Sequence, residues 1–274
     1  MRLPGRGRGD ASPPAEKRLP RWAQPFEAPE VPPGWRTGPP DFVGVGAQRA
    51  GTTWWYRGLE AHDRVVRPAG RRKELHFFNR FWDGSVPDDL AERYAELFPR
   101  PEDSITGEWT PRYMHDFWSL RLLGAAAPEA KVLVLLRDPV ERWRSGTSRA
   151  LRLAEEAGEP IRLVQLSDAV WRGFYFEQLR RVFDLFPRER VLVQQFERCR
   201  DEPLAQMART CEFLGIEPFA ELPRQMSRER APKPKPPLPE QMREELVALL
   251  ADDVRRTAEL CPEIDLARWP NFAG

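Results

Sequence analysis

The chain has 274 residues, of which 41% are hydrophobic, and its 43 basic and 42 acidic side chains give a formal net charge of +1. This length suits one large domain or two small ones, and 10 Trp with 15 Phe are ample for a packed core. The near-neutral balance argues against a nucleic-acid-binding protein, so any anion site must be built locally.

Cysteines and hydropathy exclude further classes. Cys199, Cys211 and Cys261 are odd in number and lack metal-ligand spacing, so the sequence predicts neither a disulfide framework nor a metal site. The longest apolar runs, residues 132–136 and 246–251, fall far short of the roughly 18–20 residues of a membrane span. No apolar stretch follows the N-terminal arginines, so no secretory signal is indicated and the cytoplasm is the expected location.

Residues 1–38 are rich in Pro, Arg and Gly and poor in aliphatic side chains. Such a segment buries too little surface to offset the entropy of ordering, so we predict a disordered arm. Its composition favours a solvated tail over an arm that binds nucleic acid or an acidic carrier. Residues 39–274 are the predicted folded domain.

The first segment with chemistry begins with the apolar run 42–45, which predicts a buried strand. A turn from Gly46 to Gly51 leads into a predicted helix over residues 52–60. A strand, glycine turn and helix start point backbone N–H groups and the positive helix end at one spot, which suits phosphate or sulfate. Thr52 stands where a Walker A box has Lys, so this loop is of another kind. An ordinary turn with a fortuitous glycine pair is the alternative.

The second segment, Lys73-Glu74-Leu75-His76-Phe77-Phe78-Asn79, follows a short extended piece at residues 65–68. If this segment is extended, Glu74 and His76 lie on one face. Beside aromatic side chains that exclude water, a carboxylate and an imidazole can form an acid/base pair. Surface charges at the end of a strand explain the pattern equally well.

The third segment joins the predicted central strand 132–136 to Arg137-Asp138-Pro139. Proline is tolerated in the first turn of a helix, so a helix is expected to begin there. Ligands of open α/β sheets bind at the C-terminal ends of the strands, so Arg137 and the Gly46 loop share one rim. Ser145 follows Arg137 by eight residues, about two helical turns, and both can reach one anion. The alternative is that Arg137 pairs with Asp138 or another carboxylate.

Strands and helices alternate along the remaining chain, which predicts an α/β fold of the P-loop type. We expect three α/β/α layers around a central parallel sheet of about five strands. The other predicted helices are residues 88–98, 116–127, 171–186, 203–214 and 239–260; residues 105–114 and 191–193 are predicted strands, and residues 228–237 a loop.

Together, these three segments resemble the PAPS-dependent sulfotransferase family, most closely its bacterial and heparan-sulfate-type branches. Residues 46–53, Gly-Ala-Gln-Arg-Ala-Gly-Thr-Thr, look like the 5′-phosphosulfate loop. Leu-Arg-Asp-Pro at 136–139, with Ser145, looks like the 3′-phosphate motif. Residues 73–78 look like the segment that carries the base in the glycan-acting branch. The similarity runs from about residue 39 to residue 269.

The resemblance implies sulfuryl transfer from PAPS to a hydroxyl or amine by in-line displacement, without a metal, leaving 3′-phosphoadenosine 5′-phosphate. It implies Glu74 as the general base with His76 assisting, and Arg49, where the family often has Lys, stabilising charge on the bridging oxygen. The implied donor-binding residues are Gln48, Arg49, Ala50, Gly51, Thr52, Thr53, Trp54, Arg137, Ser145, Tyr175, Lys233 and Lys235.

Two departures from the family concern the acceptor. Trp109 stands where glycan-acting relatives tend to carry a Lys that meets the acidic sugar chain, and Asn79 replaces an acidic residue. Both argue against a highly anionic glycosaminoglycan. A smaller, more apolar acceptor is expected, such as a natural product, a lipid or a small glycoside, bound by loops around residues 79–87, 112–118 and 147–165.

Two other functions fit the same fold. A P-loop kinase or NTPase needs a Lys after Gly51 and an acid after the central strand, whereas this strand ends in Arg137. A non-catalytic nucleotide-binding module is disfavoured because Arg49 and Glu74 are both present. The sequence indicates no oligomeric state.

Overall fold

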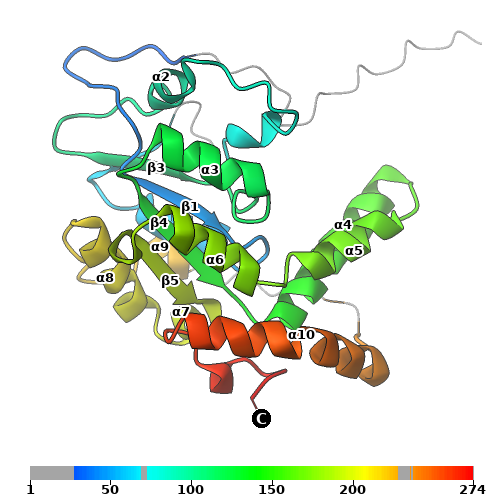
Figure 1. The fold of residues 1–274 in the computed structure, drawn as a ribbon. Helices are drawn as coiled ribbons and strands as arrows, with labels where there is room; N and C mark the ends of the chain where they lie inside the picture. The colour runs from blue at the N-terminus through cyan, green and yellow to red at the C-terminus, as the bar shows by residue number, and fades with distance from the viewer. Residues whose placement is uncertain (1–27, 69–72, 228–234, 236, 274) are drawn as a thin grey trace, which may run out of the picture.

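The computed structural model describes residues 28–68, 73–227, 235 and 237–273. Within these ranges, five strands form one sheet in the order β2-β3-β1-β4-β5, and each neighbouring pair is parallel. Helices cover both faces of the sheet (Figure 1), so the predicted three-layer α/β/α fold is confirmed. The strands are β1 (Phe42–Gly46), β2 (Val65–Val66), β3 (Ile105–Trp109), β4 (Lys131–Leu136) and β5 (Val191–Gln195).

Helices connect the strands and close the chain. The α-helices are α1 (Thr52–Leu59), α2 (Leu90–Ala95), α3 (Phe117–Ala126), α4 (Pro139–Ala157), α5 (Leu163–Trp171), α6 (Phe176–Leu185), α7 (Phe196–Asp201), α8 (Pro203–Leu214), α9 (Arg224–Ser227) and α10 (Glu240–Leu260). The short 3₁₀ helices are η3 (Phe78–Arg80), η4 (Arg188–Arg190) and η5 (Leu266–Arg268).

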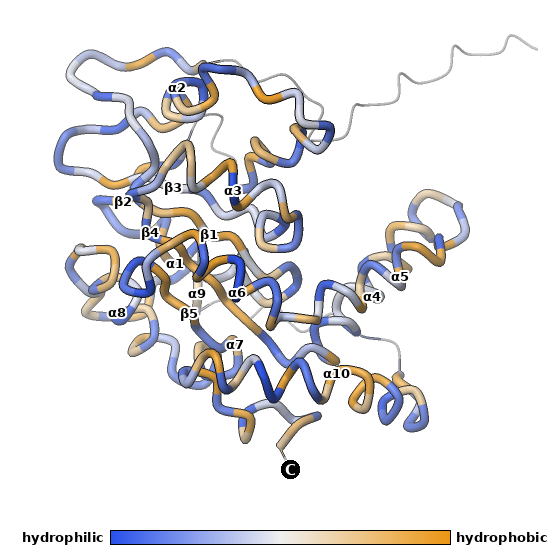
Figure 2. The backbone as a smooth tube through the Cα atoms, viewed as in Figure 1, coloured by the Kyte–Doolittle hydropathy of each residue, from blue (hydrophilic) through white to orange (hydrophobic). Residues whose placement is uncertain are grey.

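Strands β1 and β4 form the centre of the sheet, and their composition explains this position. All residues of β1 and residues 132–136 of β4 are buried. Continuous apolar runs of this kind suit parallel strands that are covered on both faces. The strands accordingly appear as a hydrophobic layer between more polar helices (Figure 2).

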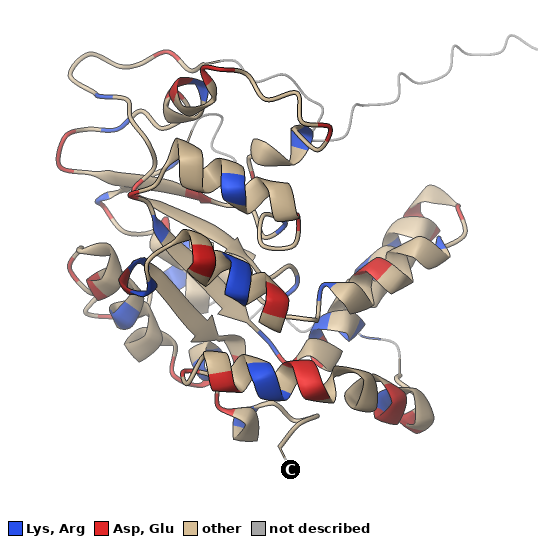
Figure 3. Cartoon of the chain, in the orientation of Figure 1, with Lys and Arg blue, Asp and Glu red and all other residues tan. Residues whose placement is uncertain are grey.

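The two helical layers are distinct. Helix α6 packs against α3 and α10, and α1 packs with α8 and α9. Trp55 of α1 anchors the second group, since its indole N–H donates to Thr210 Oγ1 at 3.3 Å. Gly58 permits this close approach, because a Cβ there would lie 2.3 Å from Met226 Sδ. Charged side chains gather on the helices and leave the strands largely without them (Figure 3).

Helices α4 and α5 form an antiparallel hairpin that projects beyond the sheet (Figure 1). Helix α4 continues to Ala157 and ends at Gly158, whose φ of 63° is left-handed. The expected loop over residues 147–165 is therefore wrong, because most of it is helical.

Two further expectations are corrected by contacts that are distant in sequence. The helix predicted over residues 171–186 begins at Phe176, because the N–H groups of Tyr175 and Phe176 donate to the Asp253 carboxylate at 2.7 and 3.2 Å. Residues 74–76 are irregular instead of extended, and His76 has a φ of 55°.

The described part of the N-terminal segment contacts the domain. Arg36 and Arg100 exchange backbone hydrogen bonds of 2.9 Å, and Arg36 Nε lies 3.1 Å from Glu102 Oε2. Residues 1–27 lie outside the described ranges, so the disordered arm stays a prediction. None of the helices described in the structure combines the length and the apolar character that crossing a membrane requires.

Gly44→Ala tests the packing between β1 and β3. A Cβ at Gly44 would lie 2.0 Å from Cδ2 of the fully buried Trp109, its neighbour across the parallel pair. Overpacking of this kind costs about 1–3 kcal/mol, so we expect a lower urea midpoint of unfolding. Gly38→Ala is the control, because its Cβ has only Arg36 Nη1 nearby, at 3.9 Å. Equal midpoints for both variants would contradict the packing.

Candidate active site

The C-terminal ends of three adjacent strands, β3, β1 and β4, meet at one edge of the sheet. The loop after β1 ends at Gly51, where α1 begins. Glycine is required there twice over. Its φ of 90° is left-handed, and a Cβ would lie 2.5 Å from the Phe196 ring. The loop therefore turns tightly enough to aim its N–H groups and the start of α1 at one position.

Arg49 joins this loop to α4. Its Nη2 donates to Ser145 Oγ at 3.0 Å, so the structure brings together two residues of motifs that lie far apart in sequence. Burial lowers the pKa of Arg49, and the charges of Arg149 and Arg152 lower it further. Cations that crowd one another in this way favour an anion between them.

A second chain of contacts runs from the loop to the proposed base. Lys73 Nζ donates to Thr52 Oγ1 and to Glu74 Oε1, both at 3.1 Å. Glu74 Oε2 lies 3.3 Å from His76 Nε2. No role for Lys73 was predicted from the sequence, although its ammonium group stands beside a carboxylate in the same segment.

Glu74 is held as a carboxylate. Burial alone would raise the pKa of Glu74, but the hydrogen bond from His76 and the charge of Lys73 outweigh burial and lower it to about 2. Burial lowers the pKa of Lys73, partly offset by Glu74. Glu74 is thus a proton acceptor whose negative charge is stabilised by its neighbours Lys73 and His76.

The irregular segment 73–77 is fixed from β3 by the side chain of Glu108. This fully buried carboxylate accepts hydrogen bonds from Leu75 N at 3.0 Å, Thr110 Oγ1 at 2.5 Å and the hydroxyl groups of Tyr94 and Tyr113, each at 2.9 Å. Burial raises the pKa of Glu108. Four donors satisfy an acceptor that would otherwise be costly to bury.

The same strand end holds the next two residues. His76 N donates to Thr110 Oγ1 at 3.2 Å, and Phe77 N donates to the Tyr113 hydroxyl at 2.8 Å. Side chains thereby replace the backbone partners that a strand would have provided. The sequence predicted a strand over these residues and a bearing of Trp109 on the acceptor, but not this supporting role of Thr110 and Tyr113.

Asn79 and Trp109 also support the site from within the core. Asn79 Oδ1 lies 2.8 Å from His76 Nδ1, while Asn79 Nδ2 donates to Asp116 Oδ2 at 2.8 Å. Trp109 is fully buried, and its indole N–H donates to the Gly46 carbonyl at 3.1 Å. Trp109 therefore gives an acceptor no surface to contact.

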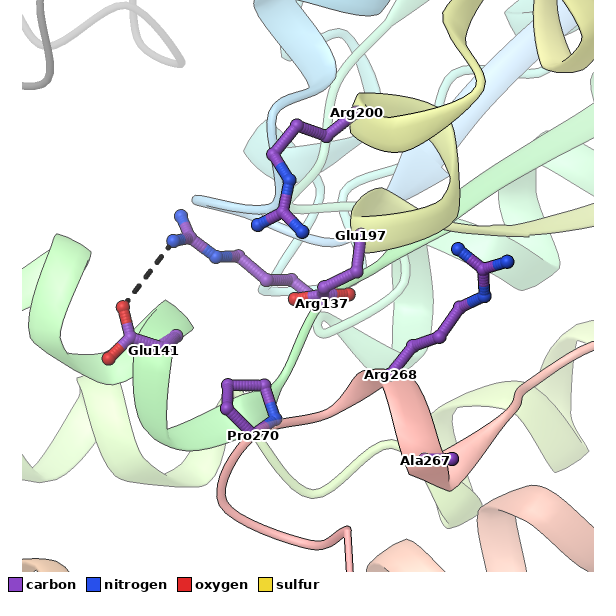
Figure 4. Close-up of a pocket in the computed structure, with 7 residues that line it drawn as sticks. All are labelled: Arg137, Glu141, Glu197, Arg200, Ala267, Arg268 and Pro270. Carbon is purple, nitrogen blue, oxygen red and sulfur yellow. Dashed lines mark ion pairs between the residues drawn. The ribbon is translucent and has the colours of Figure 1, made fainter.

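Arg137 lies at the other end of the site. Its guanidinium lies 4.7 Å from the centroid of the Phe196 ring, and its Nη2 lies 3.6 Å from Glu141 Oε2. Asp138 instead caps α4, accepting from Val140 N and Glu141 N at 2.9 and 3.0 Å. A cavity of about 330 Å³ adjoins Arg137 (Figure 4). Its lining is Arg137, Glu141, Glu197, Arg200, Ala267, Arg268 and Pro270.

The remaining residues that were predicted to bind the donor differ in their burial and contacts. Tyr175 is fully buried and its hydroxyl donates to the Arg137 carbonyl at 2.9 Å, so it holds this turn from the core side. The indole N–H of Trp54 donates to the Met226 carbonyl at 3.2 Å. In the loop and its helix, Gln48 and Thr53 are exposed, whereas Ala50 and Thr52 are buried.

Two lysines were predicted from the segment before α10. Lys235 Nζ lies 2.5 Å from Glu141 Oε2, which places it near Arg137. Lys233 lies outside the described residues. In the ranges that the structure covers, no group of three or more His, Cys, Asp or Glu side chains could hold a metal ion. The assignment of all these residues to a donor stays a prediction.

The chain is similar in sequence to known sulfotransferases. The sequence model of the sulfotransferase domain matches residues 39–231. Heparan sulfate glucosamine 3-O-sulfotransferase 6 of Mus musculus is 30% identical over 234 residues, which is 78% of this chain and 65% of that protein. Heparan sulfate glucosamine 3-O-sulfotransferase 3B1 of Homo sapiens is 29% identical over 188 residues, 65% of this chain and 46% of that protein. The chain thus spans about half to two thirds of the length of these relatives.

Two solved sulfotransferase structures superimpose on this chain. A sulfotransferase from Alicyclobacillus acidocaldarius superimposes with a TM-score of 0.67 at 27% identity, covering 85% of this chain and 99% of that one. Sulfotransferase STF9 from Mycobacterium avium superimposes with a TM-score of 0.53 at 14% identity, covering 80% and 77%, and supports the fold alone.

Lys73→Met tests the contact that lowers the pKa of Glu74. Loss of the ammonium removes an ion pair and a hydrogen bond while burial and the His76 contact remain, so the pKa of Glu74 should rise from about 2 toward its ordinary value. Carboxyl ¹³C chemical shifts followed by NMR against pH measure it. Lys131→Met removes a lysine at the N-terminal end of β4, whereas the site lies at the C-terminal ends of the strands, so the titration of Glu74 should stay unchanged. An unchanged pKa in Lys73→Met would contradict the ion pair.

Proposed function

The chain belongs to the sulfotransferase domain family, and we propose that it transfers a sulfuryl group from PAPS to a hydroxyl or amine of a small-molecule, lipid or glycoside acceptor. The observation that supports this most directly is the contact chain from Thr52 through Lys73 to Glu74. It joins an anion-binding loop to a carboxylate that can accept a proton. Both groups are needed for sulfuryl transfer, and here they share one ammonium.

In this proposal, the loop N–H groups with Thr52 and Thr53 bind the phosphosulfate. Arg49 stabilises the charge that develops on the bridging oxygen as the bond between it and sulfur breaks. Glu74 takes the proton of the acceptor while the new bond to sulfur forms. The step is a displacement, so most of its rate comes from positioning and charge stabilisation.

The low pKa of Glu74 has a place in this scheme. A carboxylate with a pKa of about 2 is a weak base, because Lys73 and His76 stabilise its charge. A phosphosulfate at Thr52 would compete with Glu74 for the Lys73 ammonium. That competition raises the basicity of Glu74 when the donor is bound, which couples proton transfer to donor binding.

Two residues, Trp109 and Asn79, were the basis for the predicted type of acceptor. Trp109 does not bear on the acceptor directly, because its side chain is buried and its indole contacts the Gly46 carbonyl of the phosphate loop. Asn79 remains, as a neutral residue next to His76 where an acid would add charge. We retain the proposal of a small hydroxyl- or amine-bearing acceptor, while the glycan named for the heparan sulfate relatives is theirs.

The kinase alternative is not favoured. The family match covers the loop, the residue after Gly51 is Thr52, and β4 ends at Leu136 before Arg137 in place of an acid. At these two positions the chain therefore lacks the lysine and the carboxylate with which a P-loop NTPase holds nucleotide and magnesium.

Glu74→Gln tests the base. The amide is nearly the same size but cannot accept the proton, so turnover should fall about 10²- to 10⁴-fold. The measurement is conversion of PAPS to 3′-phosphoadenosine 5′-phosphate with a panel of hydroxyl and amine acceptors. Calorimetric binding of the bisphosphate should not weaken, and it should tighten by at most about tenfold, because the amide no longer competes for the Lys73 ammonium. Glu92→Gln, which neutralises an exposed carboxylate on α2, is the control. Full activity would remove Glu74 from the mechanism and favour His76.

Arg137→Ala tests the donor end. Hydrogen bonds to charged groups contribute about 1.5–3 kcal/mol, so binding of 3′-phosphoadenosine 5′-phosphate should weaken roughly 10- to 100-fold. Binding of 5′-AMP, which lacks the 3′-phosphate, should change little. Equal losses for both nucleotides would contradict the assignment. Wild-type protein that prefers ATP with Mg²⁺ to the bisphosphate would overturn the proposed function itself.

A further inference from the structure

Three cations from separate positions converge on one carboxylate in the first turn of α4. Glu141 Oε2 lies 3.6 Å from Arg137 Nη2 and 2.5 Å from Lys235 Nζ, and Glu141 Oε1 lies 2.5 Å from Arg144 Nη1. The Arg137 pair is drawn at the wall of the cavity in Figure 4. Lys235 lies 94 residues away in sequence, so this cluster joins two distant parts of the chain.

The charges in this cluster do not balance. Arg137 and Lys235 share the single charge of Glu141, and in the part of the chain that the structure describes, neither has another carboxylate within 4.0 Å. A phosphate monoester carries a charge of about −1.5 to −2 at neutral pH and offers three acceptor oxygens. It would satisfy these cations better than one carboxylate does.

Glu141 nevertheless competes well for them. Burial would raise the pKa of Glu141, but hydrogen bonds from Lys235 and Arg144 outweigh burial and lower it, so the group is charged at neutral pH. Its own backbone N–H is bound by the capping carboxylate of Asp138 at 3.0 Å. The main chain of Glu141 is therefore fixed beside the cations, and its carboxylate leaves them only by a side-chain rotation.

We propose that Glu141 is an internal counter-ion that competes with the 3′-phosphate of the donor and of the product for Arg137, Arg144 and Lys235. This inference rests on the proposed function, which places a 3′-phosphate at Arg137. Glu141 stabilises the ligand-free cluster and lowers the affinity for the bisphosphate. It thereby favours release of 3′-phosphoadenosine 5′-phosphate after transfer.

An ordinary helical ion pair would behave differently. Pairs spaced i,i+3 or i,i+4 on an exposed helix add only a few tenths of a kcal/mol to stability and do not select among ligands. If Glu141 were such a residue, its neutralisation would lower stability slightly and leave nucleotide affinities alone. Competition for the phosphate predicts the opposite direction, namely tighter binding in the variant.

Glu141→Gln is the decisive variant. Calorimetric titration of the full chain with 3′-phosphoadenosine 5′-phosphate should show binding about tenfold tighter than that of the wild type, the change that corresponds to one pKa unit of interaction. Binding of 5′-AMP should change less than twofold, on the order of the few tenths of a kcal/mol left by a screened surface charge. Glu155→Gln is the matched control, because it removes the same charge from an exposed position on the same helix.

Further outcomes separate this inference from its premise. Unchanged or weaker binding of the bisphosphate by Glu141→Gln would overturn the role of Glu141 while the wild-type affinity upholds the donor site. Equal tightening for 5′-AMP or in Glu155→Gln would reduce the effect to net charge and overturn it too. No binding of the bisphosphate by either protein would overturn the proposed function together with this inference.

Two further variants distinguish competition for the cations from a change in folding. Glu141→Asp keeps the charge but shortens the side chain, so its bisphosphate affinity should lie between those of the wild type and Glu141→Gln. In a Lys235→Met background, Glu141→Gln should tighten binding less, because one of the contested cations is gone. Additive effects of the two substitutions would contradict competition for a shared cluster.

Discussion

The buried carboxylate of Glu108 determines where the proposed base lies. A charge in the interior is tolerated only when donors surround it, and Glu108 receives one backbone N–H and three hydroxyl groups. The four donors come from three parts of the structure: the base segment, α2, and the turn after β3, which supplies two of them. The carboxylate therefore fixes these parts relative to one another. Together with the hydrogen bonds from His76 N to Thr110 and from Phe77 N to Tyr113, it keeps the segment that carries Glu74 along the end of β3.

A common arrangement appears at both ends of the proposed donor site. At the loop, Lys73 is held by Glu74, and at the start of α4, Arg137 is held by Glu141. Cations gathered to bind an anionic ligand repel one another while the ligand is away. An internal carboxylate relieves this repulsion and must then give up its partner when the ligand arrives. Glu74 and Glu141 would thus both respond to donor binding, one as the base and one as a competitor.

The sequence predicted what local signals determine. Continuous apolar runs identified β1 and β4, and Pro203 with Gly215 marked the ends of α8. The rule that strand ends meet at one edge predicted that the Gly46 loop and the Arg137 turn share one rim, and the contact of Arg49 with Ser145 joins that loop to α4. Distant partners decided the rest. The alternation of Glu74 and His76 is typical of a strand, yet Thr110 and Glu108 bind the segment's N–H groups, and Asp253 moves the start of α6 to Phe176.

The hydrogen bonds around Asn79 determine how His76 faces the base. Asn79 Nδ2 donates to Asp116 Oδ2 and Ser119 Oγ, so its oxygen must face the imidazole. His76 Nδ1 therefore donates to Asn79, and Nε2 is left toward Glu74 at 3.3 Å. The neutral amide therefore fixes which ring nitrogen faces Glu74 without placing a second carboxylate beside the imidazole. Asn79 accordingly bears on the geometry around Glu74 as much as on the choice of acceptor.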